Sequence, residues 1–161
     1  MTIFGKRLSE YVAFSKHFLI LILVVGLARL ALSLGGVPNS TAKWLSISAV
    51  LTIGLLYYSI RVHTTGFGSY MQLLPIVLLQ SIVSQLVIIA GIVIAIFSGT
   101  DNIFSAQEYS GGGDGKTWAH VLAHVVFGLA LGPLVVWLVG CLIMFVVKKL
   151  APRSSATAAN A

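Results

Sequence analysis

Long runs of apolar residues dominate the chain, and short polar segments separate them. The four runs cover residues 18–37, 44–60, 73–98 and 118–147. A helix needs about 20 residues, each rising about 1.5 Å, to cross about 30 Å of hydrocarbon. Because hydrocarbon offers the backbone no hydrogen-bond partners, each run has to be helical. The pattern therefore predicts an all-α integral membrane protein with four transmembrane helices.

The composition supports this class of protein. The 161 residues are 58% hydrophobic and 9% charged, whereas soluble domains are about 25% charged. The net charge of +6 does not indicate nucleic-acid binding, because the basic residues flank the apolar runs and form no patch with aromatic residues. We therefore expect the lipid bilayer as the environment of the chain and no nucleic acid as a partner.

Basic residues near the ends of the runs predict the orientation. One side of the membrane would carry seven of them: Lys6, Arg7, Lys16, Arg61, Lys148, Lys149 and Arg153. The opposite side would carry Lys43 and Lys116. Because cytoplasmic flanks hold the excess of Lys and Arg, we expect a multipass protein of the cytoplasmic (inner) membrane with both termini in the cytoplasm.

The apolar runs also divide the chain into segments. Residues 1–17 form a cytoplasmic N-terminal segment, whose mixture of apolar residues and lysines favours an interfacial helix. Residues 18–150 form the four-helix domain, and residues 151–161 are small and polar, which favours a disordered tail. Helices three and four are longer than the bilayer is thick, so we expect them to extend into a small outer cap.

A different interpretation makes the first run a cleaved signal peptide. The chain starts with basic residues, continues with an apolar stretch and then has Ala31-Leu32-Ser33 as a cleavage motif. Arg29 precedes this motif and the apolar run continues beyond it, which favours the transmembrane interpretation.

One arginine lies inside the first run. Arg29 follows Phe18 by eleven residues, which places it about 16 Å from the inner edge of the hydrocarbon, slightly past the midplane. A central arginine costs about 2.5–3.5 kcal/mol to insert, and no run carries Asp or Glu at that depth. The candidate partners are Gln85, Asp101 or an anion supplied by another subunit, a lipid or a substrate. Alternatively, the side chain extends to the outer headgroups.

The third run carries a polar face. Gln80 and Ser84, and also Ser81 and Gln85, are spaced i, i+4, so the four side chains share one side of a helix. Amides in hydrocarbon need hydrogen-bond partners. One interpretation is hydrogen bonding between helices, and the other is a hydrophilic path for a solute or a quinone headgroup.

Two histidines precede the fourth span at ligand spacing. His120 and His124 project from one helix face, beneath a loop that contains Asp101 and Glu108. Two imidazoles and a carboxylate are a ligand set for Zn²⁺ or Cu²⁺. The alternative is that the histidines form hydrogen bonds with loop carboxylates or lipid headgroups. His17 and His63 lie at the inner ends of the first two helices, and no pair of histidines on separate helices faces each other well inside the bilayer, which disfavours haem.

Glycines continue the same helix face. Gly128 and Gly132 form a GxxxG pattern, which allows another backbone to approach closely. Just before this helix, residues 110–117 resemble a phosphate-binding P-loop, but serine replaces its first glycine and no strand precedes it. We therefore expect a linker that ends in Thr117 as the N-cap of the fourth helix.

The sequence shows no combination of nucleophile, base and acid, so we do not expect an enzyme. The favoured function is a non-catalytic subunit or accessory component of a larger membrane complex, with other membrane subunits or a second copy of the chain as partners. A homo-oligomeric transporter or channel for a small solute or anion is the alternative. A second alternative is an outward-facing metal site or membrane enzyme that uses His120 and His124.

Overall fold

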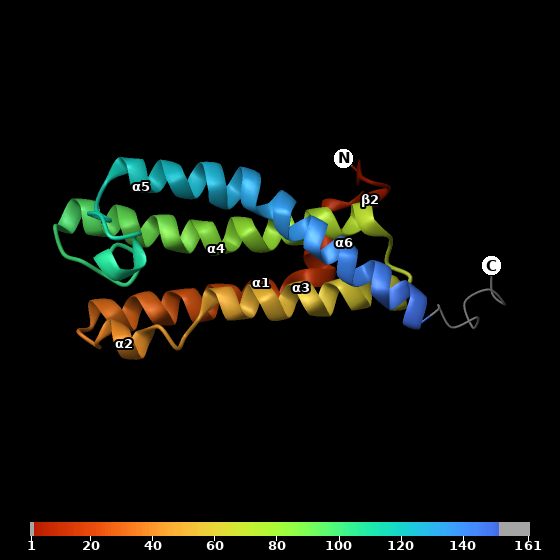
Figure 1. Cartoon of the computed structure of the whole chain (residues 1–161), viewed down its shortest axis with the longest axis horizontal. Helices are drawn as coiled ribbons and strands as arrows, with labels where there is room; N and C mark the ends of the chain where they lie inside the picture. Colours follow the sequence, from red (N-terminus) through yellow and green to blue (C-terminus); the bar gives the residue numbers. More distant parts are fainter. Residues whose placement is uncertain (1, 152–161) are drawn as a thin grey trace.

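The computed structural model describes residues 2–151, and these residues form long helices that run along one axis (Figure 1). Four stretches are long and apolar enough to cross a membrane: Leu8–Leu34, Asn39–Thr64, Tyr70–Ser98 and Trp118–Leu150. The prediction of four apolar membrane-spanning helices is therefore confirmed.

The long helices are α1 (Leu8–Leu34), α3 (Ile47–Thr64), α4 (Tyr70–Ser98) and α6 (Gly132–Leu150). The fourth span begins as α5 (Trp118–Ala123) and continues as the π-helix η2 (His124–Leu131) before it becomes α6. The short elements are the strands β1 (Thr2–Ile3) and β2 (Lys6–Arg7), α2 (Asn39–Ala42) and the 3₁₀ helix η1 (Gln107–Tyr109). The strands form an antiparallel hairpin in which Thr2 pairs with Arg7.

The bundle has two distinct ends (Figure 1). We call one the terminal end, because the β1–β2 hairpin and the last turn of α6 both lie there. The other is the loop end, which carries α2, residues 99–117 and the start of α5. Four crossings bring both ends of the described chain to the same end of the bundle.

The first helix starts ten residues before the predicted boundary at residue 18. No separate interfacial helix precedes the span in residues 2–17; the β1–β2 hairpin leads directly into α1. The Tyr11 hydroxyl donates to the carbonyl oxygen of Ile3 at 2.8 Å, and the Arg7 N–H donates to the Glu10 carboxylate at 2.7 Å. These bonds hold the hairpin against the start of the helix. The tail predicted for residues 151–161 lies, beyond Ala151, outside the described residues.

Hydroxyl side chains cap two of the helices at the loop end. The Ser46 Oγ accepts the backbone N–H of Ala49 at 3.2 Å at the start of α3. The Thr117 Oγ1 accepts the N–H of His120, also at 3.2 Å, at the start of α5. Each bond satisfies a backbone donor that has no partner within its helix. The prediction that Thr117 caps the fourth helix is confirmed.

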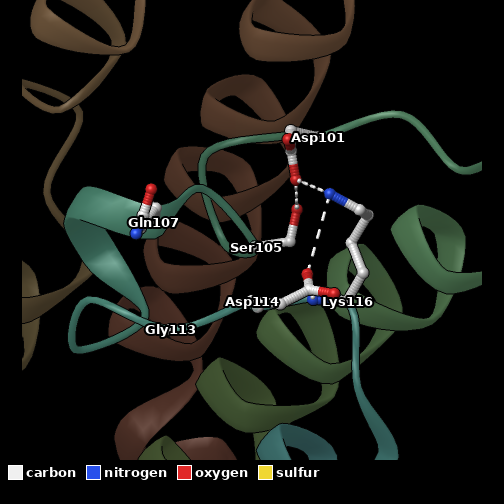
Figure 2. Close-up of a pocket in the computed structure, with 7 residues that line it drawn as sticks. Asp101, Ser105, Gln107, Gly113, Asp114 and Lys116 are labelled. Carbon is white, nitrogen blue, oxygen red and sulfur yellow. Dashed lines mark hydrogen bonds and ion pairs between the residues drawn. The ribbon is translucent and has the colours of Figure 1, made fainter.

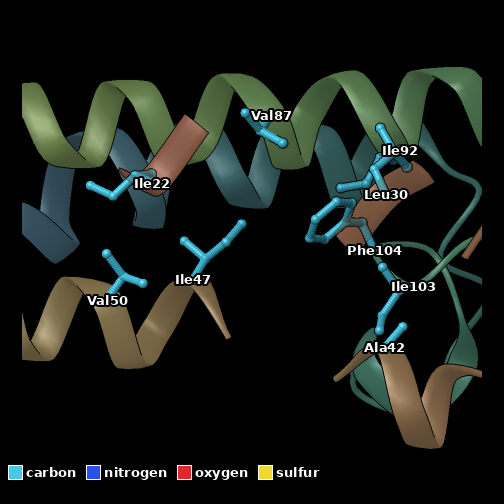
Figure 3. Packing of buried hydrophobic residues seen from close by; sticks show 9 residues of the cluster. All are labelled: Ile22, Leu30, Ala42, Ile47, Val50, Val87, Ile92, Ile103 and Phe104. Carbon is cyan, nitrogen blue, oxygen red and sulfur yellow. The ribbon is translucent and has the colours of Figure 1, made fainter. Parts of the chain in front are cut away.

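The buried apolar side chains form two clusters. The cluster at the terminal end consists of Tyr11, Tyr58, Val62, Leu73, Ile76, Val77 and Met144. The cluster toward the loop end, drawn in Figure 3, consists of Ile22, Leu30, Ala42, Ile47, Val50, Val87, Ile92, Ile103 and Phe104. Its last two members belong to the 99–117 connection. This connection therefore folds back into the bundle and forms part of its core.

The fourth span is not a regular α-helix throughout. In η2 the backbone bonds run from i to i+5, so that the N–H of Gly132 donates to the carbonyl of Phe127. Pro133 follows directly; a proline has no N–H and its ring clashes with the carbonyl four residues earlier. A Cβ at position 132 would lie 2.5 Å from the Phe127 carbonyl oxygen, so glycine suits this position. The proline thus explains why the helix is widened just before it.

The fourth span changes its neighbours along its length. Near the terminal end, α6 packs against both α3 and α4. Toward the loop end, η2 and α5 pack against α4, with no comparable contact to α3 in the described part of the chain. Figure 1 shows this span running obliquely over α4. The fourth span and α3 therefore diverge toward the loop end.

Candidate functional site

A cavity of about 330 Å³ lies between α1, α3, α4 and η2 in the loop-end half of the bundle. Its polar lining residues are Arg29, Ser48, Ser84, Gln85, Tyr109 and His124. Its apolar lining residues are Ile47, Leu51, Ile88, Ile103 and Phe104. The fold therefore brings side chains from three predicted sites, which lie far apart in the sequence, around one space.

Arg29 lies near the loop end of its helix. The residue is five positions before Leu34, where α1 ends, so it lies about 8 Å along the axis from the end of the helix. The sequence-based count started at residue 18 and placed Arg29 slightly past the midplane. Because α1 starts at Leu8, this count described only part of the helix. Within α1 itself, Arg29 is thus much closer to the loop end than to the terminal end.

Two aromatic rings cover the Arg29 guanidinium. Its Cζ lies 5.4 Å from the ring centre of Phe104 and 5.8 Å from that of Tyr109. Such cation–π contacts contribute about 0.5–2 kcal/mol each, with the larger values where water is excluded. The Arg29 Nε is buried and has no hydrogen-bond partner within residues 2–151. The rings therefore offset part of the cost of burying the charge, and one donor stays unsatisfied.

The two predicted protein partners of Arg29 bind other residues. The Gln85 Oε1 lies 2.8 Å from the Nδ1 of His124. The Asp101 carboxylate lies 2.6 Å from the Nζ of Lys116. No carboxylate of the described chain lines the Arg29 cavity. Because Gln85 and Asp101 are paired with other residues, an anion from outside the chain is the remaining predicted partner of Arg29.

The polar residues of α4 lie against two different neighbours. A Cβ added to Gly54 would lie 2.6 Å from the Gln80 Oε1, so Gln80 is packed against α3. A Cβ added to Gly128 would overlap the amide of Gln85, so Gln85 is packed against η2. The polar residues predicted to share one face of α4 therefore contact two different helices. Gly54 leaves room for the Gln80 amide, and Gly128 leaves room for the Gln85 amide. At Gly128 the three atoms nearest to an added Cβ all belong to the Gln85 side chain.

The two histidines lie side by side, with ring centres 4.9 Å apart. The Nδ1–H of His120 donates to the carbonyl oxygen of Gly115 at 2.9 Å, and the Nδ1 of His124 faces the Gln85 Oε1. The Gly115 carbonyl oxygen can only accept, so the His120 Nδ1 donates to it. In the tautomer in which the His124 Nδ1 likewise donates to the Gln85 Oε1, each neutral ring has its lone pair on Nε2. A second cavity, of about 390 Å³, is lined by Gln85, His120, Ala123, His124, Phe127 and Gly128.

The loop carboxylates form a separate cluster at the surface of the loop end (Figure 2). The Lys116 Nζ lies 2.6 Å from Asp101 and 3.7 Å from Asp114. The hydrogen bond to Asp101 raises the pKa of Lys116 above its usual value. Neither Asp101 nor Glu108 lines a cavity with the histidines, and residues 2–151 contain no group of three His, Cys, Asp or Glu residues placed to hold a metal.

Sequence reasoning missed the loop residues that complete the Arg29 cavity. The Asn102 amide donates to the carbonyl oxygen of Gly91 at 2.7 Å, and its Oδ1 accepts the backbone N–H of Phe104 at 2.9 Å. These bonds fix the loop where Phe104 and Tyr109 cover Arg29. The signal in the sequence was the apolar pair Ile103-Phe104 within an otherwise polar connection.

The four apolar helices define the class of this chain, which is a membrane protein. No family model matches the sequence, and the comparisons with curated proteins and with solved structures give no match. The two cavities and the side chains that line them are therefore the features from which a function can be inferred.

Proposed function

We propose that this chain is a non-catalytic membrane protein that binds an anionic group at Arg29. One observation carries this proposal: the Arg29 Nε is buried beside a cavity and has no acceptor within the described residues. A buried cation without a counter-charge is costly. An oxyanion would accept charge-assisted hydrogen bonds from the planar guanidinium, and it would compensate for the lost hydration.

The proposal includes the topology predicted from the basic residues. Lys6, Arg7, Arg61, Lys148 and Lys149 belong to elements at the terminal end, which supports a cytoplasmic position for that end in the inner membrane. The loop end, with its covered cavity, would then face outward as the cap. Because Phe104 and Tyr109 cover Arg29, the cavity fits the retention of an anion better than its passage through an oligomeric channel.

Mass spectrometry of the intact protein, purified from its native membrane in a mild neutral detergent, tests the anion site. We expect about one acidic compound per chain in the wild type and in Lys43→Gln, and its loss in Arg29→Gln. Lys43 is the matched control because it is a cation at the loop end that does not line the cavity. Equal retention of the acidic compound by Arg29→Gln would overturn the proposal.

We further propose that the chain is an accessory component of a larger membrane complex, and the same preparation tests this association. As an accessory component, the chain should elute in stoichiometric amounts with one or more other membrane proteins. Elution as an isolated chain or as a homo-oligomer would contradict this association and would leave the anion site to be judged separately.

A metal-binding function is the second candidate, and the orientation of the histidines favours it. In metal sites a ligating imidazole usually donates its other N–H to an oxygen, which fixes the lone pair on the ligating nitrogen. His120 and His124 both have this arrangement. They would supply two nitrogen ligands for Zn²⁺ or Cu²⁺, and the remaining ligands would come from water or from a partner.

Metal analysis of the purified protein separates this candidate from simple hydrogen bonding. We expect near-stoichiometric Zn²⁺ or Cu²⁺ in the wild type and its loss in the double variant His120→Gln/His124→Gln. His17→Gln is the control, because His17 is an exposed histidine in the terminal-end half of α1. Equal metal content in all three proteins would exclude a histidine site.

A further inference from the structure

The Arg29 cavity combines a charged region with an apolar region. Arg29, Ser84 and Gln85 provide polar groups, whereas Leu51 and Ile88 provide hydrocarbon walls. A small inorganic ion would use the polar groups alone. A molecule with an anionic head and an apolar continuation would use both regions. The lining therefore matches an amphiphile better than a free ion.

The cavity is covered toward the loop end. Phe104 is buried against α4, where a Cβ on Gly91 would lie 2.6 Å from its ring. Tyr109 lies over the guanidinium, and its hydroxyl is 3.4 Å from the carbonyl oxygen of Asn39 in α2. These two aromatic side chains separate Arg29 from the water at the loop end.

The side of the cavity between α3 and η2 lacks comparable cover. As described above, η2 packs against α4 and diverges from α3. The exposed large apolar residues on these two elements include Ile53, Leu56, Val125, Val126 and Phe127, and α3 also exposes the hydroxyl residues Ser48 and Thr52. Large apolar side chains are expected on a surface in contact with lipid. Access to Arg29 from the side is thus access from the bilayer.

Arg29 also lies at a depth that suits a lipid headgroup. It is about 8 Å below the loop end of α1. Exposed tryptophans at the same end of the bundle, Trp44 and Trp118, mark the level of a membrane–water interface. The volume of about 330 Å³ is at the small end of ordinary ligand sites. It has room for a headgroup, while two complete acyl chains would have to remain outside.

The geometry points to an acidic phospholipid of the loop-end leaflet as the ligand, with its phosphate bound by Arg29. The headgroup enters sideways between α3 and η2, and the acyl chains remain in the bilayer. The guanidinium can donate two parallel N–H bonds to a phosphate. This inference rests on the proposed anion site and specifies which class of anion occupies it.

Defined probes test this assignment on the delipidated full chain in neutral detergent. We would measure the unfolding temperature during titration with short-chain phosphatidylglycerol, short-chain phosphatidylcholine, inorganic phosphate or a fatty acid. Phosphatidylglycerol should raise the unfolding temperature, and the other three should have little effect at equal concentration. Arg29→Gln should weaken the apparent affinity for phosphatidylglycerol by about tenfold or more, the scale of a charge-assisted hydrogen bond. Lys43→Gln should bind like the wild type.

The other outcomes distinguish this inference from the anion site itself. Equal effects of phosphatidylglycerol and inorganic phosphate, both lost in Arg29→Gln, would overturn the lipid assignment and keep the anion site. A stronger effect of the fatty acid would overturn the assignment of a phosphate as the bound group, and it would support a different anionic amphiphile as the ligand. Equal effects of the two phospholipids, or an unchanged affinity in Arg29→Gln, would overturn the inference. Arg29→Lys keeps the charge and should bind with intermediate affinity, which also controls for misfolding of Arg29→Gln.

Discussion

The side-chain amide of Asn102 donates a 2.7 Å hydrogen bond to the backbone carbonyl of Gly91, eleven residues earlier in the chain. Both residues are buried. The bond ties the start of the 99–117 connection to α4, and the Asn102 Oδ1 then accepts the N–H of Phe104. One side chain thus determines where the loop enters the bundle and which ring covers Arg29.

Replacing Asn102 should therefore destabilise the protein. Asn102→Ala leaves the buried N–H of Phe104 without its acceptor, and a loss of this kind costs about 1–3 kcal/mol. Denaturant unfolding in detergent micelles measures the change, and limited proteolysis should show faster cleavage between residues 99 and 117. Gln107→Ala is the control, since its amide makes one exposed hydrogen bond in the same connection. Equal stability of the two variants would show that Asn102 does not anchor the loop.

Gln85 should be important for the position of His124. Gln85→Leu removes the acceptor of the His124 Nδ1–H, which lies 2.8 Å away in the structure. An unpaired donor in a partly buried site lowers the free energy of unfolding by about 1–3 kcal/mol. Thermal unfolding measures this loss, and ¹⁵N NMR of the imidazole should show that His124 no longer has a single tautomer.

Leu86→Val is the matched control for Gln85→Leu, because Leu86 is the next residue of α4 and its side chain is 61% exposed. A loss of stability as small as that of the control, together with an unchanged imidazole spectrum, would show that the bond contributes little.

A methyl group at position 128 should be poorly tolerated. The Cβ in Gly128→Ala would overlap the Gln85 amide, and overpacking of this kind costs about 1–3 kcal/mol. Gly113→Ala is the control, because a Cβ there would meet no atom within 4 Å. Unfolding temperatures of the two variants in the same detergent measure the difference. Similar temperatures would mean that Gln85 moves away without cost.

The ion pair between Lys116 and Asp101 should give a stability that depends on pH. Its hydrogen bond raises the pKa of Lys116 above the value of 10.5 expected for the unfolded chain. The folded chain therefore binds this proton more tightly, so the stabilisation is fully present below pH 10.5 and is lost as the pH rises through the higher pKa of the folded state. The difference in unfolding temperature between the wild type and Asp101→Asn should shrink above pH 10.5. For Glu108→Gln, an exposed loop acid, no such pH-dependent difference is expected.

The helices were predictable because their signal is repeated over many residues. Runs of about twenty apolar residues leave few alternatives in lipid, and all four runs correspond to spans in the structure. The start of α1 at Leu8 was missed, since Lys16 and His17 interrupt the apolar pattern without interrupting the helix. Apolarity predicts where lipid begins, whereas the helix itself continues until the backbone hydrogen bonds end.

The Arg29 site could be predicted in part. The sequence indicated Arg29, Gln85 and His124 as separate features, and the structure places them around one cavity. Their position around one cavity depends on how far α3 and the fourth span diverge. This divergence is a property of the tertiary structure, and a local sequence pattern does not predict it. The cover by Phe104 and Tyr109 depends on the hydrogen bonds of Asn102 to Gly91 and Phe104. The apolar pair Ile103-Phe104 indicated that this part of the connection is buried, but it did not indicate which residue it covers.

The π-helix sets the rotation of His120 and His124 relative to α6. Each residue of an α-helix turns the chain by about 100°, and the widened turn accommodates one residue more than an α-helical turn does. If the same residues had regular α-helical bonding, the segment before them would rotate by roughly the angle of one residue. His120 and His124 would then point away from Gln85, although every chemical group of the site would still be in the chain. The widened turn beside Pro133 thus sets the angle between the two parts of the fourth span, and the directions of the side chains at this end depend on the number of residues in that turn as much as on their identity.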